Sequence, residues 1–127
     1  MQFEKDKPIY AQIVDRIIEN ILQNKWRPEE RIPSVREMAV ELEVNPNTVV
    51  RSYSYLQEQG VIYNQRGIGY FVSEAGKEQA KQIKRTEFIE KELPYFFKTL
   101  HLLGMDMGEV EQKYITYKKR EEKGENQ

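Results

Sequence analysis

The sequence has no cysteine, a single histidine and no long apolar run in its 127 residues. Without cysteine the chain has neither a disulfide framework nor a thiolate metal site. A membrane-spanning helix needs roughly 18 or more apolar residues in succession, and no segment approaches that length. Charged residues occur from the fourth position on, so the first residues do not resemble a signal peptide. We therefore expect a soluble, cytoplasmic protein without a metal or other cofactor.

Catalytic groups are also scarce. The one histidine, His101, lies between Leu100 and Leu102 in an apolar segment. No serine–histidine–carboxylate set and no paired metal ligands can be assembled around it. The glycines at 67 and 69 are not followed by the Gly-Lys-Ser/Thr of a phosphate-binding loop. The sequence therefore predicts that the protein is not an enzyme.

The chain has little excess charge of either sign. It contains 20 Lys and Arg against 21 Asp and Glu. A dedicated nucleic-acid-binding domain is more often basic, so a DNA-binding surface here requires that folding separate the charges. We expect three arginines on one surface, Arg36, Arg51 and Arg66. Three glutamates should lie elsewhere, Glu41, Glu43 and Glu58.

Residues 34 to 42 predict a short amphipathic helix. Apolar side chains recur there with helical spacing at Val35, Met38, Ala39 and Leu42. Ser34, followed three residues later by Glu37, forms a capping box, in which each side chain satisfies a backbone N–H of the first turn. The helix should therefore begin at Ser34.

A second helix is predicted from Pro46 to Gln59, after a three-residue turn. Asn45 is a good N-cap, and Pro46 is tolerated at the first helical position because no N–H is needed there. Gly60 is suited to the left-handed conformation that ends a helix. Two helices joined by so short a turn are typical of a helix-turn-helix.

The second helix has one apolar and one polar face. At 100° per residue, Val49, Tyr53 and Leu56 share a face, and the opposite side carries Asn47, Thr48, Arg51 and Tyr55. Asn pairs with an adenine edge and Arg with guanine, and hydroxyl groups bond phosphates or bases. Most such polar stripes are merely solvated, but the preceding helix and short turn favour a helix that reads the major groove.

Residues 61–63 and 70–72 are β-branched or aromatic, and the loop between them contains two glycines. This pattern predicts a β-hairpin, which would be the wing of a winged helix-turn-helix. Arg66 lies near the tip of that loop. There it can enter the minor groove or contact a phosphate.

The flanking segments are helical in pattern. Isoleucines at four-residue steps from Ile9 to Ile21 predict a helix over residues 8–24 that supports the core. In the connector that follows, Trp26 is interpreted as a packing residue and Pro28 as a residue that interrupts regular structure. Downstream of residue 75 a helix is predicted that breaks near Pro94 and ends at Gly104. Another begins at Asp106.

The C-terminal helices carry more apolar side chains than they can bury by themselves. We interpret eight of these residues as a dimerisation surface: Phe88, Leu93, Phe96, Phe97, Leu100, Val110, Tyr114 and Tyr117. Burial against a second copy of the chain would give a two-fold dimer with two DNA-reading heads. The alternative is that the tail folds back on its own winged domain.

With these motifs, the chain resembles the GntR family of bacterial transcription regulators, and most closely its short YtrA-like subgroup. The resemblance covers essentially the whole length. It is carried by Arg-Ile-Pro-Ser-Val-Arg-Glu-Met-Ala at 31–39, Asn-Pro-Asn-Thr-Val at 45–49, residues 56–62, and Gly-Ile-Gly-Tyr-Phe-Val at 67–72. Each motif is weak alone, but their order and spacing together are specific.

The resemblance implies roles for three residues. Arg36 matches an arginine that contacts DNA, Thr48 matches a recognition-helix threonine that meets backbone phosphate, and Gly67 matches the wing-tip glycine. Only about 55 residues follow the wing, which is too few for the effector-binding or aminotransferase-like domains of the larger branches. The resemblance instead implies a short dimerisation tail and repression of operons for membrane export or ABC-type transporters.

The chain departs from many family members at two recognition-helix positions. Pro46 and Val50 stand where arginines are frequent. By the resemblance, base reading shifts to Asn47 and Arg51, an arrangement that looks YtrA-like and leaves the operator sequence open.

We therefore predict a mainly α protein with a small β-hairpin: a winged helix-turn-helix over 1–74 and a helical dimerisation tail over 75–127. The expected function is a sequence-specific transcriptional regulator, a homodimeric repressor of a transporter operon that binds an inverted repeat in double-stranded DNA. The alternative is a winged-helix protein–protein adaptor that does not bind DNA. A small-molecule effector stays open, since no ligand pocket is evident. The expected DNA-binding residues are Ser34, Arg36, Asn45, Asn47, Thr48, Arg51, Tyr55, Arg66 and Gly67.

Overall fold

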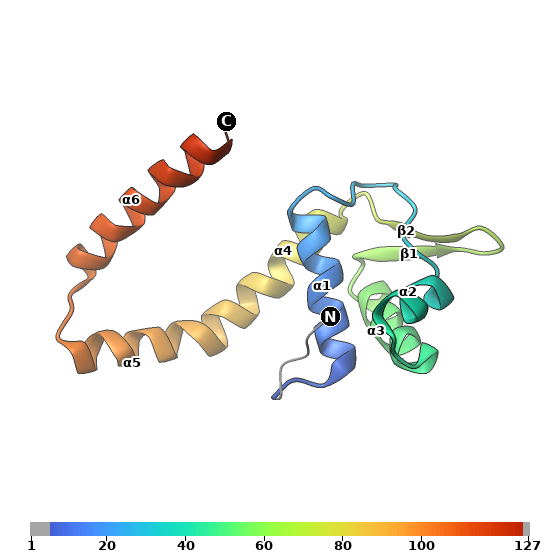
Figure 1. Cartoon of the computed structure of the whole chain (residues 1–127), viewed down its shortest axis with the longest axis horizontal. Coiled ribbons are helices and arrows are strands. Elements are labelled where there is room, and N and C mark those ends of the chain that lie inside the picture. The colour runs from blue at the N-terminus through green and yellow to red at the C-terminus, as the bar shows by residue number, and fades with distance from the viewer. Residues whose placement is uncertain (1–5, 126–127) are drawn as a thin grey trace. The chain divides into compact units, whose positions relative to one another are not determined.

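The computed structural model describes residues 6–125 and divides into two compact units, residues 1–85 and 86–127. We call the described parts of these units the head (6–85) and the tail (86–125). The head contains α1 (Ile9–Leu22), α2 (Val35–Leu42), α3 (Pro46–Glu58), β1 (Ile62–Gln65), β2 (Gly69–Val72) and nearly all of α4 (Gly76–Glu87) (Figure 1). The tail contains the π-helical turn η1 (Phe88–Glu92), α5 (Leu93–Leu103) and α6 (Met107–Glu125).

The head has the predicted fold class, three helices followed by an antiparallel hairpin. β1 and β2 pair from Ile62 opposite Val72 to Gln65 opposite Gly69. The loop closes with a 2.9 Å hydrogen bond from the Ile68 N–H to the Gln65 carbonyl. Gly67 has a φ of +82°, a left-handed conformation that glycine adopts without strain. The hairpin loop therefore depends on the glycine that the sequence supplies.

Both predicted helix starts are confirmed. The Ser34 Oγ accepts from the Glu37 N–H at 3.0 Å, and the Glu37 carboxylate accepts from the Ser34 N–H at 3.1 Å. The Asn45 Oδ1 accepts from the Asn47 N–H at 2.8 Å, with Pro46 in the first turn. The Ser34 cap thus fixes the start of α2, and the Asn45 cap fixes the end of the three-residue turn between α2 and α3. At the other end of that turn, Glu43 closes α2 with a left-handed φ of +57°.

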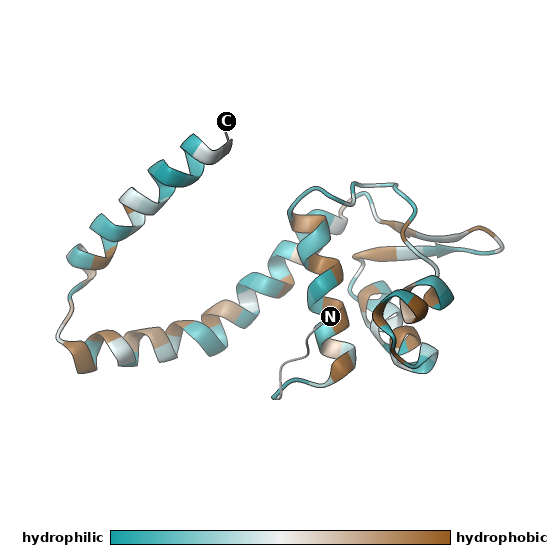
Figure 2. Cartoon of the chain, in the orientation of Figure 1, coloured by the Kyte–Doolittle hydropathy of each residue, from teal (hydrophilic) through white to brown (hydrophobic). Residues whose placement is uncertain are grey.

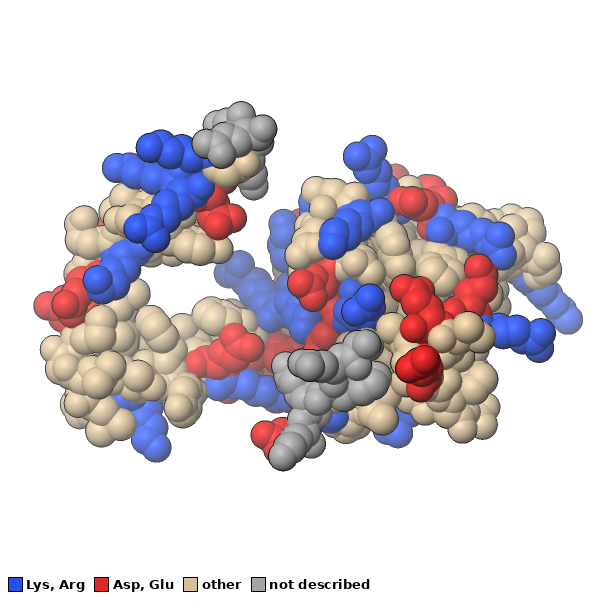
Figure 3. All heavy atoms as spheres, viewed as in Figure 1, with Lys and Arg blue, Asp and Glu red and all other residues tan. Residues whose placement is uncertain are grey.

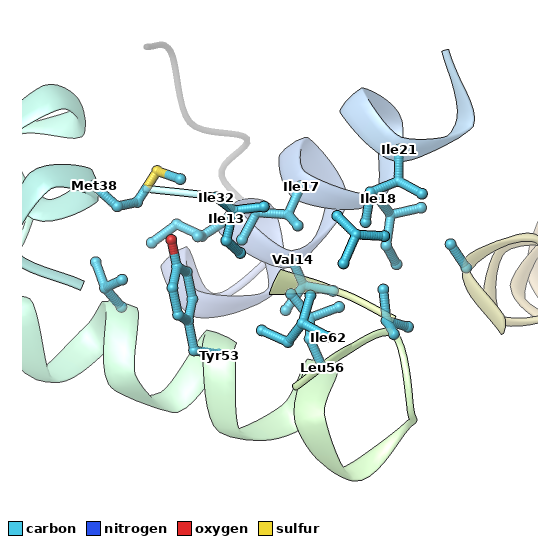
Figure 4. Close-up of a cluster of buried hydrophobic side chains, with 14 of the residues drawn as sticks. Ile13, Val14, Ile17, Ile18, Ile21, Ile32, Met38, Tyr53, Leu56 and Ile62 are labelled. Atoms are coloured by element: carbon cyan, nitrogen blue, oxygen red, sulfur yellow. The ribbon is translucent and has the colours of Figure 1, made fainter. Parts of the chain in front are cut away.

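The core lies between α1, α2, α3 and the hairpin (Figure 4). Ile13, Ile17 and Leu56 are fully buried, as the helical periodicity predicts. α4 also contributes, because Ala80 is fully buried in the same cluster and the Lys84 Nζ lies 2.5 Å from the Asp15 Oδ1 of α1. α4 therefore packs within the head, although the sequence analysis grouped this helix with the tail.

The connector before α2 forms a short third arm of the wing. The Glu29 N–H bonds the Val72 carbonyl at 2.8 Å, and the Ile32 N–H bonds the Tyr70 carbonyl at 3.0 Å. Between them, Arg31 forms an antiparallel bridge with Phe71. The sequence predicted only a connector around Trp26 and Pro28, because a few residues of mixed polarity give no strand periodicity.

In the tail, the helix predicted to break near Pro94 continues instead. Proline lacks the N–H for the usual bond to the carbonyl four residues earlier, and its ring crowds that carbonyl. The chain accommodates this with the wider turn η1, in which the Leu93 N–H bonds the Phe88 carbonyl five residues back. α5 then ends at Gly104, which has a φ of +67°, as predicted. α6 begins with a 2.9 Å bond from the Glu109 N–H to the Asp106 Oδ1.

The tail hardly buries its apolar side chains. Of its described residues, only Leu100 is buried, with 8% of its surface exposed. Hydrophobic positions recur along η1 and α5 (Figure 2). Among the residues predicted to form a dimerisation surface, Leu93 and Val110 are half-buried. The others are exposed: Phe88, Phe96, Phe97, Tyr114 and Tyr117.

Candidate nucleic-acid interface

α3 separates a packed face from a polar one, as its sequence predicts. Val49, Tyr53 and Leu56 are fully buried. On the other side Asn47 and Arg51 are exposed. The outward groups at the start of α3 are therefore an amide and a guanidinium, the two side-chain types that pair bidentately with adenine and guanine edges.

Two other predicted residues on α3 are less open. Thr48 is half-buried, and it lines a surface depression together with Asn47 and Arg51. Tyr55 is half-buried and packs against the core cluster. Part of the Tyr55 ring therefore supports the fold, and the rest borders the depression that Arg51 also lines.

The N-termini of α2 and α3 both face outward with capped first turns. A helix N-terminus attracts anions, since its backbone N–H groups and dipole favour negative charge. Arg36, in the first turn of α2, is exposed, as are Asn45 and Pro46 at the start of α3. The Ser34 side chain, half-buried, is held by its cap bond. These groups are suited to contacts with phosphate.

The Glu37 carboxylate is part of the α2 capping box. Its pKa is lowered because the Ser34 backbone N–H and then the Ser34 hydroxyl bond the charged form, with a smaller contribution from nearby Arg31. Glu37 is therefore held in its charged form, with the carboxylate fixed in the cap.

Arg51 has an aromatic partner that the sequence analysis missed. Its guanidinium carbon lies 3.8 Å from the centre of the Tyr10 ring of α1. The buried hydroxyl of Ser52 donates to the Tyr10 carbonyl at 2.8 Å. No sequence signal connects these positions, because Tyr10 and Arg51 lie on different helices and meet only in the folded head.

The wing tip carries Arg66 and Gly67, and both are exposed. A second arginine, Arg31, lies beside β2 of the wing. A Cβ placed on Gly69 would lie 2.9 Å from the Arg31 Nε, so the Arg31 side chain runs against this glycine. The sequence pattern did not predict this position, because Arg31 reaches the wing only through the backbone bridge with Phe71.

Separation of charge is incomplete. Glu58 was expected to lie away from Arg51, but both line one depression with Tyr10, Ser54 and Tyr55. The expectation was wrong because Glu58 follows Arg51 by two helical turns and so shares its face. Acidic side chains also gather over the α2 region of the face seen in Figure 3, with basic ones toward the wing.

Other kinds of site are not apparent. Within residues 6–125 no cluster of three or more His, Cys, Asp or Glu side chains is arranged to hold a metal ion. In the same range, no helix combines the length and the apolar character that crossing a membrane requires.

A short turn between two capped helices, an outward polar face on the second helix and an arginine-tipped hairpin define a winged helix-turn-helix regulator. The family model described as "Bacterial regulatory proteins, gntR family" matches residues 9–72, and the chain belongs to this family of DNA-binding transcriptional regulators. Its members are regulators and not enzymes, in agreement with the sequence analysis.

Two curated relatives from Bacillus subtilis (strain 168) match most of the chain. One is the uncharacterized HTH-type transcriptional regulator YhcF, 36% identical over 109 residues, which are 86% of this chain and 88% of YhcF. The other is the HTH-type transcriptional repressor YtrA, 34% identical over 103 residues, which are 81% of this chain and 78% of YtrA. The predicted resemblance to short YtrA-like regulators is therefore confirmed.

Solved structures of transcriptional regulators also resemble this chain. A putative GntR-family transcriptional regulator from Bacteroides thetaiotaomicron is 46% identical, with a TM-score of 0.74 over 90% of this chain and 99% of that one. The DNA-binding domain of AraR, crystallised in complex with operator ORR3, is 32% identical, with a TM-score of 0.53 over 57% of this chain and 88% of that one.

Proposed function

We propose that the protein is a homodimeric repressor that binds an inverted repeat, with each head reading one half-site. The start of α3 lies in the major groove, and the wing lies beside the adjacent minor groove. The observation that carries this proposal is the outward Asn47–Arg51 surface opposite the fully buried Val49, Tyr53 and Leu56. A helix packed in this way is rigid, so its polar side chains are presented to DNA in a fixed register.

The relatives support the details of this function. YtrA is named a repressor, and the AraR domain that resembles the head was crystallised with an operator. The resemblance to short YtrA-like regulators points further to an operon for a membrane transporter as the target. A regulator of this kind works where the DNA is, so we place the protein in the cytoplasm.

The exposed apolar side chains of the tail support the proposal of a homodimer. Phe88, Phe97, Tyr114 and Tyr117 are each about half exposed or more, and among described tail residues Leu100 alone is buried. Large exposed apolar patches mark interaction surfaces. A second copy of the chain, which brings the same surface, would cover this patch around a two-fold axis. We therefore divide the chain functionally into a DNA-reading head and a dimerisation tail.

The test is a gel-shift series across salt concentration with an operator obtained by genomic footprinting. Arg51→Ala should weaken binding to the cognate site by about 1–3 kcal/mol and relax base preference at one position, because a base contact is lost. Arg36→Ala should weaken binding to all sequences and reduce the salt slope by about 1, because a phosphate contact is lost. Unchanged affinity in both variants would show that this face does not read DNA. Self-association without any duplex binding at low salt would favour the adaptor alternative.

A further inference from the structure

Arg51 is held in place without using its hydrogen-bond donors. Its guanidinium lies over the Tyr10 ring at 3.8 Å, and within residues 6–125 it makes no hydrogen bond or ion pair. A guanidinium has five N–H donors in its plane, and a stacking contact leaves the edges that carry them open. An ion pair with Glu58, in the same depression, would instead have occupied the donors that a guanine requires.

Tyr10 is itself fixed against α3. The Ser52 Oγ donates to the Tyr10 carbonyl at 2.8 Å and approaches the Thr48 carbonyl at 3.2 Å. Ser52 is fully buried, so this link lies inside the interface between α1 and α3. Because Ser52 directly follows Arg51, the backbone that carries the ring and the backbone that carries the guanidinium are joined at adjacent positions.

Tyr10 also borders two depressions beside the polar face of α3. It lines one depression with Asn47, Thr48 and Arg51, and a second with Arg51, Ser54, Tyr55 and Glu58. The stacked pair therefore separates these two depressions on the α3 surface. Arg36 and Arg66, the other two arginines of the expected interface, form no cation–π pair among the described residues.

We propose that Tyr10 is a specificity-determining positioning residue, which orders the Arg51 guanidinium for base reading before DNA binds. This inference rests on the proposed function, since it takes Arg51 as a base reader. A free arginine loses side-chain freedom when it binds, and a stacked one has lost much of it already. Loss of the ring should therefore weaken binding to the cognate operator about 2- to 10-fold. Operators altered at the base pair read by Arg51 should be affected less.

The experiment is a double-mutant cycle on the full chain with Tyr10→Leu, Arg51→Ala and the double variant. Affinities are measured for the cognate operator and for one changed at the Arg51 base pair. We expect Tyr10→Leu to reduce discrimination between the two operators, to have little effect in the Arg51→Ala background, and to be rescued by Tyr10→Phe, which keeps the ring. The matched control is Ile9→Ala, since this exposed neighbour lines the same depression but has no ring to stack on the guanidinium.

Other outcomes overturn the proposal in distinct ways. Additive effects of the two substitutions would mean that Tyr10 acts independently of Arg51. A Tyr10→Phe variant as weak as Tyr10→Leu would mean that the hydroxyl contacts DNA directly. Tighter operator binding by Tyr10→Leu would mean that stacking on the Tyr10 ring competes with the contact between Arg51 and the base. If Arg51→Ala itself changes neither operator affinity nor base preference, Arg51 is not a base reader. That result contradicts the proposed function, and it is distinct from a failure of Tyr10 to position Arg51.

A spectroscopic measurement keeps the test independent of operator and of the Leu variant. In the wild-type protein without DNA, protons of the Arg51 side chain, assigned by comparison with Arg51→Ala, should be shifted upfield by the ring current of Tyr10. Tyr10→Phe should preserve the shift, and Tyr10→Leu should abolish it. The absence of this shift in the wild-type protein would overturn the proposal even if Tyr10→Leu failed to fold.

Discussion

The head and the tail use similar helical patterns but bury them to very different degrees. In the head, Ile13, Ile17 and Val49 are fully buried. In the tail, Phe97 is 49% and Leu102 74% exposed. Burial of apolar surface is the main favourable contribution to folding. The head therefore has what it needs to fold as an independent unit, whereas the tail requires a further surface before its apolar residues stabilise anything.

The largest effect should come from removal of the tail. A chain that ends after Arg85 keeps α4 on the core, including Ala80 and the ion pair between Lys84 and Asp15. We expect this head to fold as a monomer and to bind an inverted repeat about 10²- to 10⁴-fold more weakly, because two linked heads bind with a high effective concentration and one head does not. Light scattering and gel shifts measure the two effects.

Two controls separate loss of dimerisation from damage to the head. Fusion of a two-stranded coiled coil after Arg85 should restore much of the lost affinity. A chain that ends after Glu74 should instead lose stability, because Ala80 is removed from the core. A full-length chain that is monomeric at micromolar concentration would contradict the assignment of the tail to dimerisation.

Matched truncations of one side chain in each unit should also differ. Ile17→Ala, at a fully buried position, should lower the free energy of unfolding of the head by about 2–4 kcal/mol, since it leaves a cavity. Leu102→Ala, at an exposed position, should leave the unfolding of the head unchanged. Urea denaturation followed by Trp26 fluorescence reports on the head alone, because Trp26 packs against its core and is the one tryptophan.

Features that depend only on neighbouring residues were predictable from the sequence. The caps at Ser34 and Asn45 and the glycines at 60, 67 and 104 act on their own neighbours, so the sequence alone predicted these helix ends and the hairpin loop. The same holds for the buried face of α3, where periodicity is local information. In this region local preference and the final fold agree.

Features that depend on distant contacts were not predictable in this way. Tyr10 meets Arg51 only after α1 packs on α3, and Arg31 reaches the wing only through backbone pairing with β2. The turn η1 at Pro94 is one of two ways a helix responds to proline, and the sequence does not decide between a break and a wider turn. The sequence therefore identified individual residues of the candidate site, but not the tertiary contacts that hold these residues in place.

A buried hydroxyl offers a third comparison. The Tyr53 hydroxyl donates to the Pro33 carbonyl at 2.6 Å and joins α3 to the turn before α2. Tyr53→Phe should lower the free energy of unfolding of the head by about 1–2 kcal/mol, because the half-buried Pro33 carbonyl loses its partner. Tyr114→Phe, at an exposed tail position, is the control and should have no effect.

Tyr53 should also make the stability of the head depend on pH in the alkaline range. Burial, and then the nearby Tyr70, Glu37 and Glu41, raise the pKa of Tyr53 well above its usual value. A raised pKa in the folded state means that the associated stability is fully present below about pH 10, where the unfolded tyrosine is also neutral, and is lost as pH rises further. Above that pH the wild-type protein should lose stability more steeply than Tyr53→Phe. If the free energy of unfolding of the two proteins fell equally with pH, the raised pKa of Tyr53 would not be the cause.

The smallest effects should come from the two helix caps, which are alike in geometry but lie in different units. The Ser34 Oγ and the Asp106 Oδ1 accept from the N–H three residues later at 3.0 and 2.9 Å. Ser34→Ala should lower the free energy of unfolding of the head by about 1 kcal/mol, since α2 belongs to its core. Asp106→Ala should remove a similar local contribution from α6 and reduce far-ultraviolet helicity, without a shift in the Trp26 transition. If the two substitutions lower that transition equally, head and tail unfold as one cooperative unit, and the tail is stabilised within its own chain and not by a second copy.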